Sequence, residues 1–287
     1  MVANIPPPKD DSIEVFLRIL DERKRHLDFY QRIKNDWQKS IEIYIKHKGN
    51  PEKIAALDLL LYTKDEDEAE DRKKSLIGLY SPQQGKTPHE ILSKMRREHG
   101  LICCPSCGEA GIPGTLDHYL PKDEFPELSV LLLNLTPMCF ECQQAKGTQY
   151  KTNNGSKKYI HPYFDEVTTP LYKITFQPPY NSPKFSIVMN DDIEPDLLKL
   201  ANEHAIGIDL TLRLKKFCNT KYVHLLKSAK RHRDKGGRVG LGEIIEILLQ
   251  SEEDKSINCW EAVFYRSALA DKDLIDYLEN GDLPDNL

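Results

Sequence analysis

Long hydrophobic runs are missing from the sequence, and this argues against a membrane-spanning protein. Apolar runs such as Val130–Leu133 are only a few residues long, whereas a transmembrane helix needs roughly 18 or more apolar residues. The N-terminal segment MVANIPPPKDD also lacks the hydrophobic stretch of a signal peptide. We therefore expect a cytoplasmic protein with no membrane partner.

Internal repeats and long Gly- or Ser-rich linkers are also missing, so the sequence gives no sign of a repeat architecture or of two freely linked domains. The chain has 287 residues, of which 39% are hydrophobic and 30% charged. This composition is typical of a globular protein, and the length is sufficient for a sizeable core.

An excess of positive charge is absent, because the formal net charge is -5. Since cationic side chains supply most non-specific affinity for nucleic acid, the chain should not coat DNA or RNA indiscriminately. The exception is the segment 213–238, with ten Lys or Arg and one acid. It is either a substrate-facing stripe or a solvated helix face whose apolar side chains, such as Leu214 and Leu225, belong to the core.

Residue periodicity and turn signals predict an α+β fold with a central module between two mostly helical regions. Two capping boxes, Asp11–Glu14 and Thr87–Glu90, predict helix starts in the N-terminal region. Short alternating stretches within 172–189 predict a hairpin in the C-terminal region. The predicted divisions are a mobile tail at 1–10, a helical region at 11–100, the central module at 101–166, and a hairpin followed by helices at 167–287.

Four of the seven cysteines form two CxxC pairs, which predict a structural zinc site. The pairs are Cys104-Pro-Ser-Cys107 and Cys139-Phe-Glu-Cys142. Two such pairs can supply four thiolates to one tetrahedral Zn²⁺, whereas a redox protein needs a single CxxC. We expect the other three cysteines to be buried thiols: Cys103, Cys218 and Cys259.

Between and just after the cysteine pairs lies a set of residues suited to metal binding and proton transfer. Asp117 is a hard anionic ligand of the kind that Mg²⁺ prefers. The neighbouring His118 has a side chain that can be neutral at cellular pH and accept a proton from water. Asn134 follows, and Gln143 comes directly after Cys142. Together these residues predict a metal-assisted hydrolase.

This pattern resembles the HNH, or ββα-metal, nuclease motif, which covers roughly residues 104–147. The resemblance implies that His118 is the general base, that Asp117 holds a catalytic Mg²⁺ or Mn²⁺, and that Asn134 orients His118. Gln143 stands where the family usually has Asn or His as a second metal ligand. A Gln carbonyl can still bind Mg²⁺, but His161 or Asp165 could instead return to the cleft, or the site could be impaired.

Two lysines near the motif, Lys122 and Lys146, are candidates for phosphate contacts, with ordinary surface lysine as the alternative. Nuclease components of bacterial anti-phage operons look similar in size and motif. That likeness implies a DNA endonuclease working with a partner protein, such as an ATPase or sensor, which would deliver the substrate. Two alternatives stay open: the same chemistry on RNA, or a non-catalytic zinc-bearing adaptor that binds a protein or nucleic acid.

Overall fold

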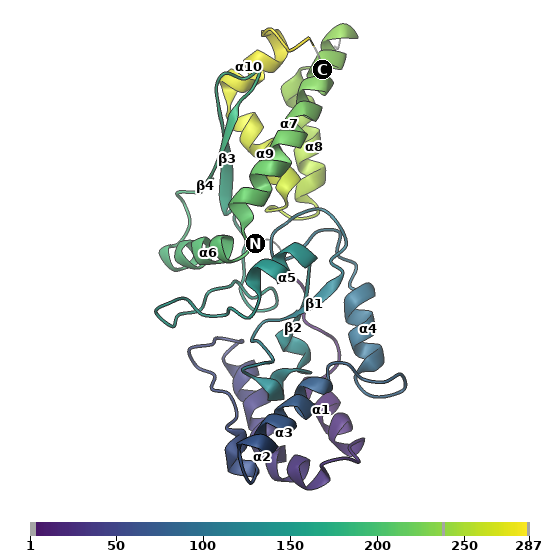
Figure 1. Cartoon of the computed structure of the whole chain (residues 1–287). Coiled ribbons are helices and arrows are strands. Elements are labelled where there is room, and N and C mark those ends of the chain that lie inside the picture. Colours follow the sequence, from purple (N-terminus) through teal and green to yellow (C-terminus); the bar gives the residue numbers. More distant parts are fainter. Residues whose placement is uncertain (1–3, 237–238, 286–287) are drawn as a thin grey trace. The chain divides into compact units, whose positions relative to one another are not determined.

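The computed structural model describes residues 4–236 and 239–285, which form two compact units. We call residues 4–101 and 112–166 the N-terminal unit, and residues 102–111 and 167–285 the C-terminal unit. Both appear in Figure 1, and each is described by itself. The fold is mixed, with many helices and two small antiparallel sheets, which confirms the predicted α+β class. None of the helices in the described ranges has the length and apolarity to pass through a bilayer.

The N-terminal unit has a helical part built around the buried stripe of one long helix. The side chains of Ile33, Trp37 and Tyr44 on this helix are fully buried, and the Trp37 indole Nε1 donates a hydrogen bond to the Glu127 carbonyl at 2.6 Å. The helices of this part are α1 (Ser12–Asp21), α2 (Leu27–Lys46), α3 (Glu66–Gly78) and α4 (His89–Arg97), with a short 3-10 turn at Leu59–Tyr62.

Of the two predicted capping boxes, one is confirmed and one is wrong. The Asp11 carboxylate accepts hydrogen bonds from the backbone N–H groups of Ile13 and Glu14 and caps α1. Thr87 caps no helix, because its hydroxyl and its backbone N–H both donate to the Glu22 carboxylate. Helix α4 begins instead after Pro88, which offers no side-chain cap.

The second part of the N-terminal unit is small and carries the predicted catalytic residues. Strand β1 (Thr115–His118) pairs antiparallel with β2 (Leu135–Met138), with Asp117 opposite Thr136. Two 3-10 turns, Pro126–Leu128 and Leu132–Asn134, lie in the connection between the strands. Helix α5 (Phe140–Lys146) follows β2 directly, and Cys139 is its N-cap.

The C-terminal unit combines a hairpin with five helices, as the periodicity of the C-terminal region predicts. Strands β3 (Tyr172–Gln177) and β4 (Lys184–Met189) pair antiparallel. The buried side chains of β3, Tyr172, Ile174 and Phe176, pack against α9, where Ser267 accepts the Ile174 N–H. The helices are α6 (Pro195–Gly207), α7 (Leu210–Asp234), α8 (Leu241–Glu253), α9 (Trp260–Ala270) and α10 (Lys272–Asn280).

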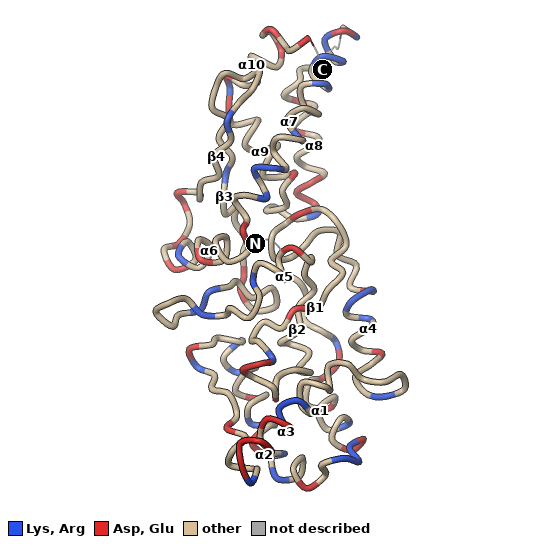
Figure 2. Tube along the Cα trace, in the orientation of Figure 1, with Lys and Arg blue, Asp and Glu red and all other residues tan. Residues whose placement is uncertain are grey.

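The basic segment 213–238 lies mostly on α7, which is labelled in Figure 2. Two of its arginines make contacts within the C-terminal unit. Arg213 forms an ion pair with Glu109. The Arg233 guanidinium donates hydrogen bonds to carbonyls at the end of α10, including the Leu278 carbonyl at 2.6 Å. Leu214 and Leu225 are buried, as predicted. These contacts favour a solvated helix face over a substrate-facing stripe. Arg238 lies outside the described residues.

Two predicted boundaries differ from the structure. Residues 102–111, which the sequence assigns to the module at 101–166, pack in the C-terminal unit, where the Trp260 indole Nε1 donates to the Cys107 carbonyl at 2.7 Å. The predicted mobile tail at 1–10 is fixed at Ile5, which is buried and donates its N–H to the Pro162 carbonyl at 2.9 Å. Residues 1–3 of that tail lie outside the described residues.

Candidate active site and cysteine cluster

The four predicted zinc ligands lie together. Their Sγ atoms are all within 4.8 Å of one another, and three of the four residues are buried. A tetrahedral Zn²⁺ with Zn–S distances of about 2.3 Å requires sulfurs this close. Cys104, Cys107, Cys139 and Cys142 can therefore hold a structural metal such as zinc.

The other three cysteines, Cys103, Cys218 and Cys259, are buried, as predicted. Burial raises the pKa of the Cys103 thiol to about 11 and that of Cys218 to about 12. These two thiols stay protonated at neutral pH, and a protonated thiol is a poor nucleophile and a poor metal ligand.

His118 is the last residue of β1, and one of its two ring nitrogens is engaged in a hydrogen bond. Its Nε2 lies 2.9 Å from the Ser129 carbonyl oxygen. Because a carbonyl oxygen only accepts hydrogen bonds, Nε2 must carry the proton, which leaves the lone pair on Nδ1. Burial lowers the pKa of His118 to about 3, with smaller contributions from Lys122 and other cations. The imidazole is therefore neutral at cellular pH, as a general base must be before it accepts a proton.

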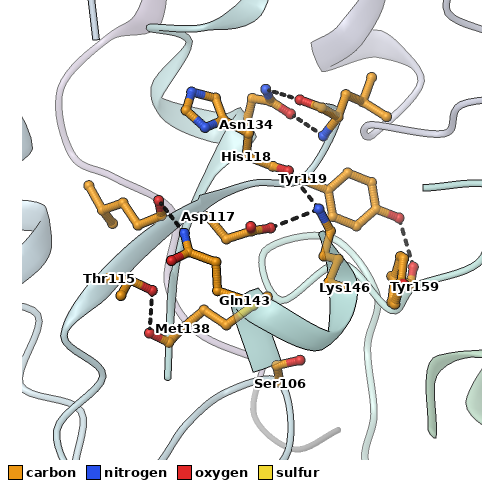
Figure 3. Close-up of polar contacts among 12 residues, drawn as sticks. Ser106, Thr115, Asp117, His118, Tyr119, Asn134, Met138, Gln143, Lys146 and Tyr159 are labelled. Carbon is orange, nitrogen blue, oxygen red and sulfur yellow. Dashed lines mark hydrogen bonds and ion pairs between the residues drawn. The ribbon is translucent and has the colours of Figure 1, made fainter. Parts of the chain in front are cut away.

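Asp117, one residue earlier, is buried with a lysine as its partner. Lys146 Nζ lies 2.9 Å from Asp117 Oδ2 and donates a hydrogen bond to the His118 carbonyl at 2.8 Å (Figure 3). Lys146 is only 1% exposed, so the suggestion that it contacts a substrate phosphate is wrong. Burial raises the pKa of Asp117, against the opposing effects of Lys146 and Gln143.

Asn134 joins the connection between the strands to the end of β1. Its Oδ1 accepts the Leu120 N–H at 2.8 Å, and its Nδ2 donates to the carbonyls of Leu120 and Leu128 at 3.0 and 3.2 Å (Figure 3). The side chain is completely buried. These bonds fix the backbone two residues beyond His118, a geometry that suits the predicted orienting role.

Gln143 lies on α5 and turns its amide nitrogen toward β1. Its Nε2 donates to the Leu116 carbonyl at 3.3 Å, and the same side chain hydrogen-bonds Asp117 and lowers the pKa of that carboxyl. With the amide N–H groups used in this way, the carbonyl oxygen is the atom left for a metal ion or a substrate.

His161 does not return to the cleft. It is completely buried, its Nδ1 accepts the Tyr163 N–H at 3.2 Å, and its Nε2 lies 3.0 Å from the Tyr44 hydroxyl. Gly49, at φ +70°, makes room for it, because a Cβ there would lie 2.9 Å from the His161 ring. Asp165 pairs with Lys157 instead. We therefore assign His161 to the core of the N-terminal unit and Asp165 to a half-buried ion pair.

A cavity of about 510 Å³ opens beside the predicted catalytic residues, and His118, Asp117 and Gln143 line it. Two cations also line it. Arg96 and Lys122 lie over the Tyr80 ring, at 5.0 and 5.2 Å from its centre. Lys122 was a predicted site residue, whereas Arg96 was not, because it lies outside the motif at 104–147.

The Tyr80 side chain positions both His118 and the cations. Its ring meets the His118 imidazole edge to face at 4.4 Å, and its hydroxyl donates to the Leu116 carbonyl at 2.9 Å. Tyr80 lies outside the motif at 104–147, and no local sequence pattern marks it. Tyr80 thus belongs to the wall of the site.

The cavity wall fits a divalent ion only in part. Asp117 is the buried carboxylate in the wall, and Lys146 Nζ, 2.9 Å from its Oδ2, already balances its charge. No group of three or more His, Cys, Asp or Glu ligands in the described ranges includes Asp117. Mg²⁺ commonly binds through one or two carboxylates, several waters and the substrate phosphate. The residues therefore fit an ion whose coordination is completed by water and the substrate phosphate, and they do not form a complete set of protein ligands.

Comparisons with known proteins give one short match. No family model matches the chain, and no solved structure matches it. Protein ea31 of Escherichia phage lambda is 38% identical over 63 residues, which are 22% of this chain and 21% of ea31. The chain therefore matches about a fifth of that relative's length, and the relative's name states no activity.

Proposed function

We propose that the chain is a metal-dependent endonuclease of the HNH type, which hydrolyses phosphodiester bonds in DNA. One observation carries the proposal: His118 lines a cavity with its Nε2 proton committed to the Ser129 carbonyl, so that a neutral Nδ1 is left to accept a proton. Water attacking phosphorus must lose a proton, and a fixed imidazole is the usual acceptor.

The charges around His118 support a phosphate substrate. Arg96 and Lys122 line the same cavity, and their cations can neutralise phosphate oxygens and the negative charge that develops during attack. Both side chains lie over Tyr80, which restricts their positions. This local pair supplies the positive face that an acidic chain needs at its substrate site.

In this proposal the two metals have separate roles. Zinc would be held by the four cysteines, leaving no open position for catalysis. Mg²⁺ or Mn²⁺ would be held by Asp117 with the Gln143 carbonyl oxygen, and would stabilise negative charge on the phosphate. The low pKa of His118 makes it a weak base in the free protein. A bound phosphate would raise that pKa by placing negative charge nearby.

The proposed biological setting is bacterial anti-phage defence in the cytoplasm, with an ATPase or sensor as partner. Its support is the likeness of the motif to defence nucleases, together with a net charge of -5 that makes delivery by a partner useful. RNA is the second substrate to test, because the same chemistry does not require DNA.

The Lys146 ion pair favours a second candidate, a zinc-bearing adaptor without catalysis. Lys146 balances the charge of Asp117, and Gln143 stands where the family usually has Asn or His as a metal ligand. Such a site could bind a phosphate or a partner without cleaving it. The two candidates differ in whether His118 matters for turnover.

A cleavage assay with Mg²⁺ or Mn²⁺ on plasmid DNA, linear DNA and RNA tests the proposal. We expect the wild type to cut DNA and His118→Ala to lose at least about 100-fold in rate, since general base catalysis contributes about that much or more. The exposed His224 provides the matched control, His224→Ala, which should cut normally. No cleavage of any substrate, or equal cleavage by His118→Ala, would contradict the proposal and favour the adaptor.

A further inference from the structure

A second and larger cavity in the N-terminal unit has no part in the proposed chemistry. Its volume is about 790 Å³, and it shares no lining residue with the cavity at His118. Its walls come from the turn between α1 and α2, from α3, and from the segment that follows α3. This volume lies within the range of about 300–1,000 Å³ that is typical of small-molecule sites.

The wall of this cavity is strongly basic. Six Lys or Arg residues line it against two acids, so its formal charge is +4 in a chain whose net charge is -5. The cations come from the turn between α1 and α2, from α3 and from the segment that follows α3: Arg23, Lys24, Arg25, Arg72, Lys74 and Lys86. Clustered cations of this kind repel one another, which favours an anionic ligand between them.

Unused hydrogen-bond donors reinforce the charge. The Arg72 guanidinium contacts Glu68 and His26, but its buried Nε has no acceptor among the described residues. His26 also lines the cavity and is the N-cap of α2, a helix of 20 residues. It gives that helix no side-chain cap and has left-handed backbone, at φ +56°. An uncapped helix N-terminus favours negative charge nearby.

We propose that this cavity binds a small anion with two or more phosphate groups, such as a nucleoside di- or triphosphate. Several phosphate oxygens can engage arginine guanidinium groups in paired hydrogen bonds while lysines add point charges. A volume of about 790 Å³ is that of a site for one small molecule, so we choose a compact ligand over a nucleic-acid strand. The proposal does not depend on the nuclease activity, because binding here requires no cleavage.

Isothermal titration calorimetry on the full chain, with pyrophosphate and ATP as probes, tests this site. We expect both to bind the wild type and adenosine not to bind. Loss of one charge-assisted contact weakens binding by about tenfold or more, so Arg72→Gln and Lys86→Ala should each raise the Kd for ATP by about that factor. Lys86 is exposed, so its variant should fold even where Arg72→Gln does not.

Lys73→Ala is the matched control, because Lys73 follows Arg72 on α3 but lines a different cavity. It should bind ATP with the wild-type Kd. The proposal is overturned if neither pyrophosphate nor ATP binds, or if Lys73→Ala weakens binding as much as Lys86→Ala. It is also overturned if a 20-nucleotide strand binds in a Lys86-dependent way while ATP does not, which would make the cavity part of a nucleic-acid path.

Discussion

Lys146 Nζ lies 2.9 Å from Asp117 Oδ2 and 2.8 Å from the His118 carbonyl oxygen, and both charged side chains are buried. The Lys146 ammonium group on α5 therefore contacts both of the last two residues of β1. This contact joins the helix to the strand that carries the proposed base, and it balances the charge of the only acidic residue of that strand.

Removal of the lysine charge should destabilise the N-terminal unit. Lys146→Met leaves Asp117 buried without a cation, and breaking a buried pair in this way costs about 3–5 kcal/mol. Urea unfolding followed by circular dichroism would measure the loss. Lys34→Met, on the exposed face of α2, is the control and should change stability little. Adding Asp117→Asn to Lys146→Met should restore part of the loss, and a double variant no more stable than the single one would contradict the account.

Zinc content should follow the four clustered cysteines. We expect one Zn²⁺ per purified chain, measured by elemental analysis, because the four sulfurs lie within 4.8 Å of one another. Cys142→Ser should lose the metal and lower the melting temperature, since structural zinc contributes directly to folding. Cys218→Ala should keep it, because that thiol lies outside the cluster. Full zinc content in Cys142→Ser would rule out this site.

Loss of the Asn134 amide should weaken both the fold and the site. Asn134→Ala would leave the N–H and C=O of Leu120 and the Leu128 carbonyl without their partner, and each unmet buried group costs about 1–3 kcal/mol. We expect a loss of a few kcal/mol in the free energy of unfolding. Slower DNA cleavage should appear even at temperatures where the variant stays folded. Wild-type stability in Asn134→Ala would show that these bonds contribute nothing.

The stability should fall with rising pH through the titration of Glu127. Burial raises the pKa of this carboxyl to about 7, from its ordinary value of 4.5. Because the folded pKa is raised, the stabilising contribution of the protonated acid is complete below about pH 4.5. It is lost as the pH rises to about 7.

Glu127→Gln removes this titration and keeps an acceptor for the Leu57 N–H. Relative to the wild type, the variant should gain up to about 3 kcal/mol between pH 4.5 and pH 8, since each pKa unit is worth about 1.36 kcal/mol. Urea unfolding across this pH range measures the difference. A constant difference between the two proteins would mean that Glu127 titrates normally.

The short-range features of the molecule were predictable from the sequence because they depend on neighbouring residues. Periodicity and turn signals predicted the helices on both sides of the motif and the hairpin of β3 and β4. The spacing of the CxxC pairs predicted the cysteine cluster. The capping box at Thr87 failed because Glu22, 65 residues earlier, takes the hydroxyl.

The parts of the site that sequence reasoning missed depend on long-range packing. Arg96 and Tyr80 join the cavity from outside the motif, and no local pattern marks them. Lys146 has an ordinary surface-lysine context in the sequence, and its burial follows only from α5 packing on β1. His161 is enclosed by aromatic residues, and one of them, Tyr119, is distant in sequence.

Chemical rescue of the proposed base tests the central claim most directly. His118→Gly removes the imidazole ring from the wall of the cavity of about 510 Å³. Free imidazole can enter the cavity and take the place of that ring. Under single-turnover conditions with Mg²⁺ and plasmid DNA, we expect His118→Gly to be inactive and added imidazole to restore cleavage in a concentration-dependent way. Cleavage by His118→Gly at the wild-type rate without imidazole would show that His118 is not the base.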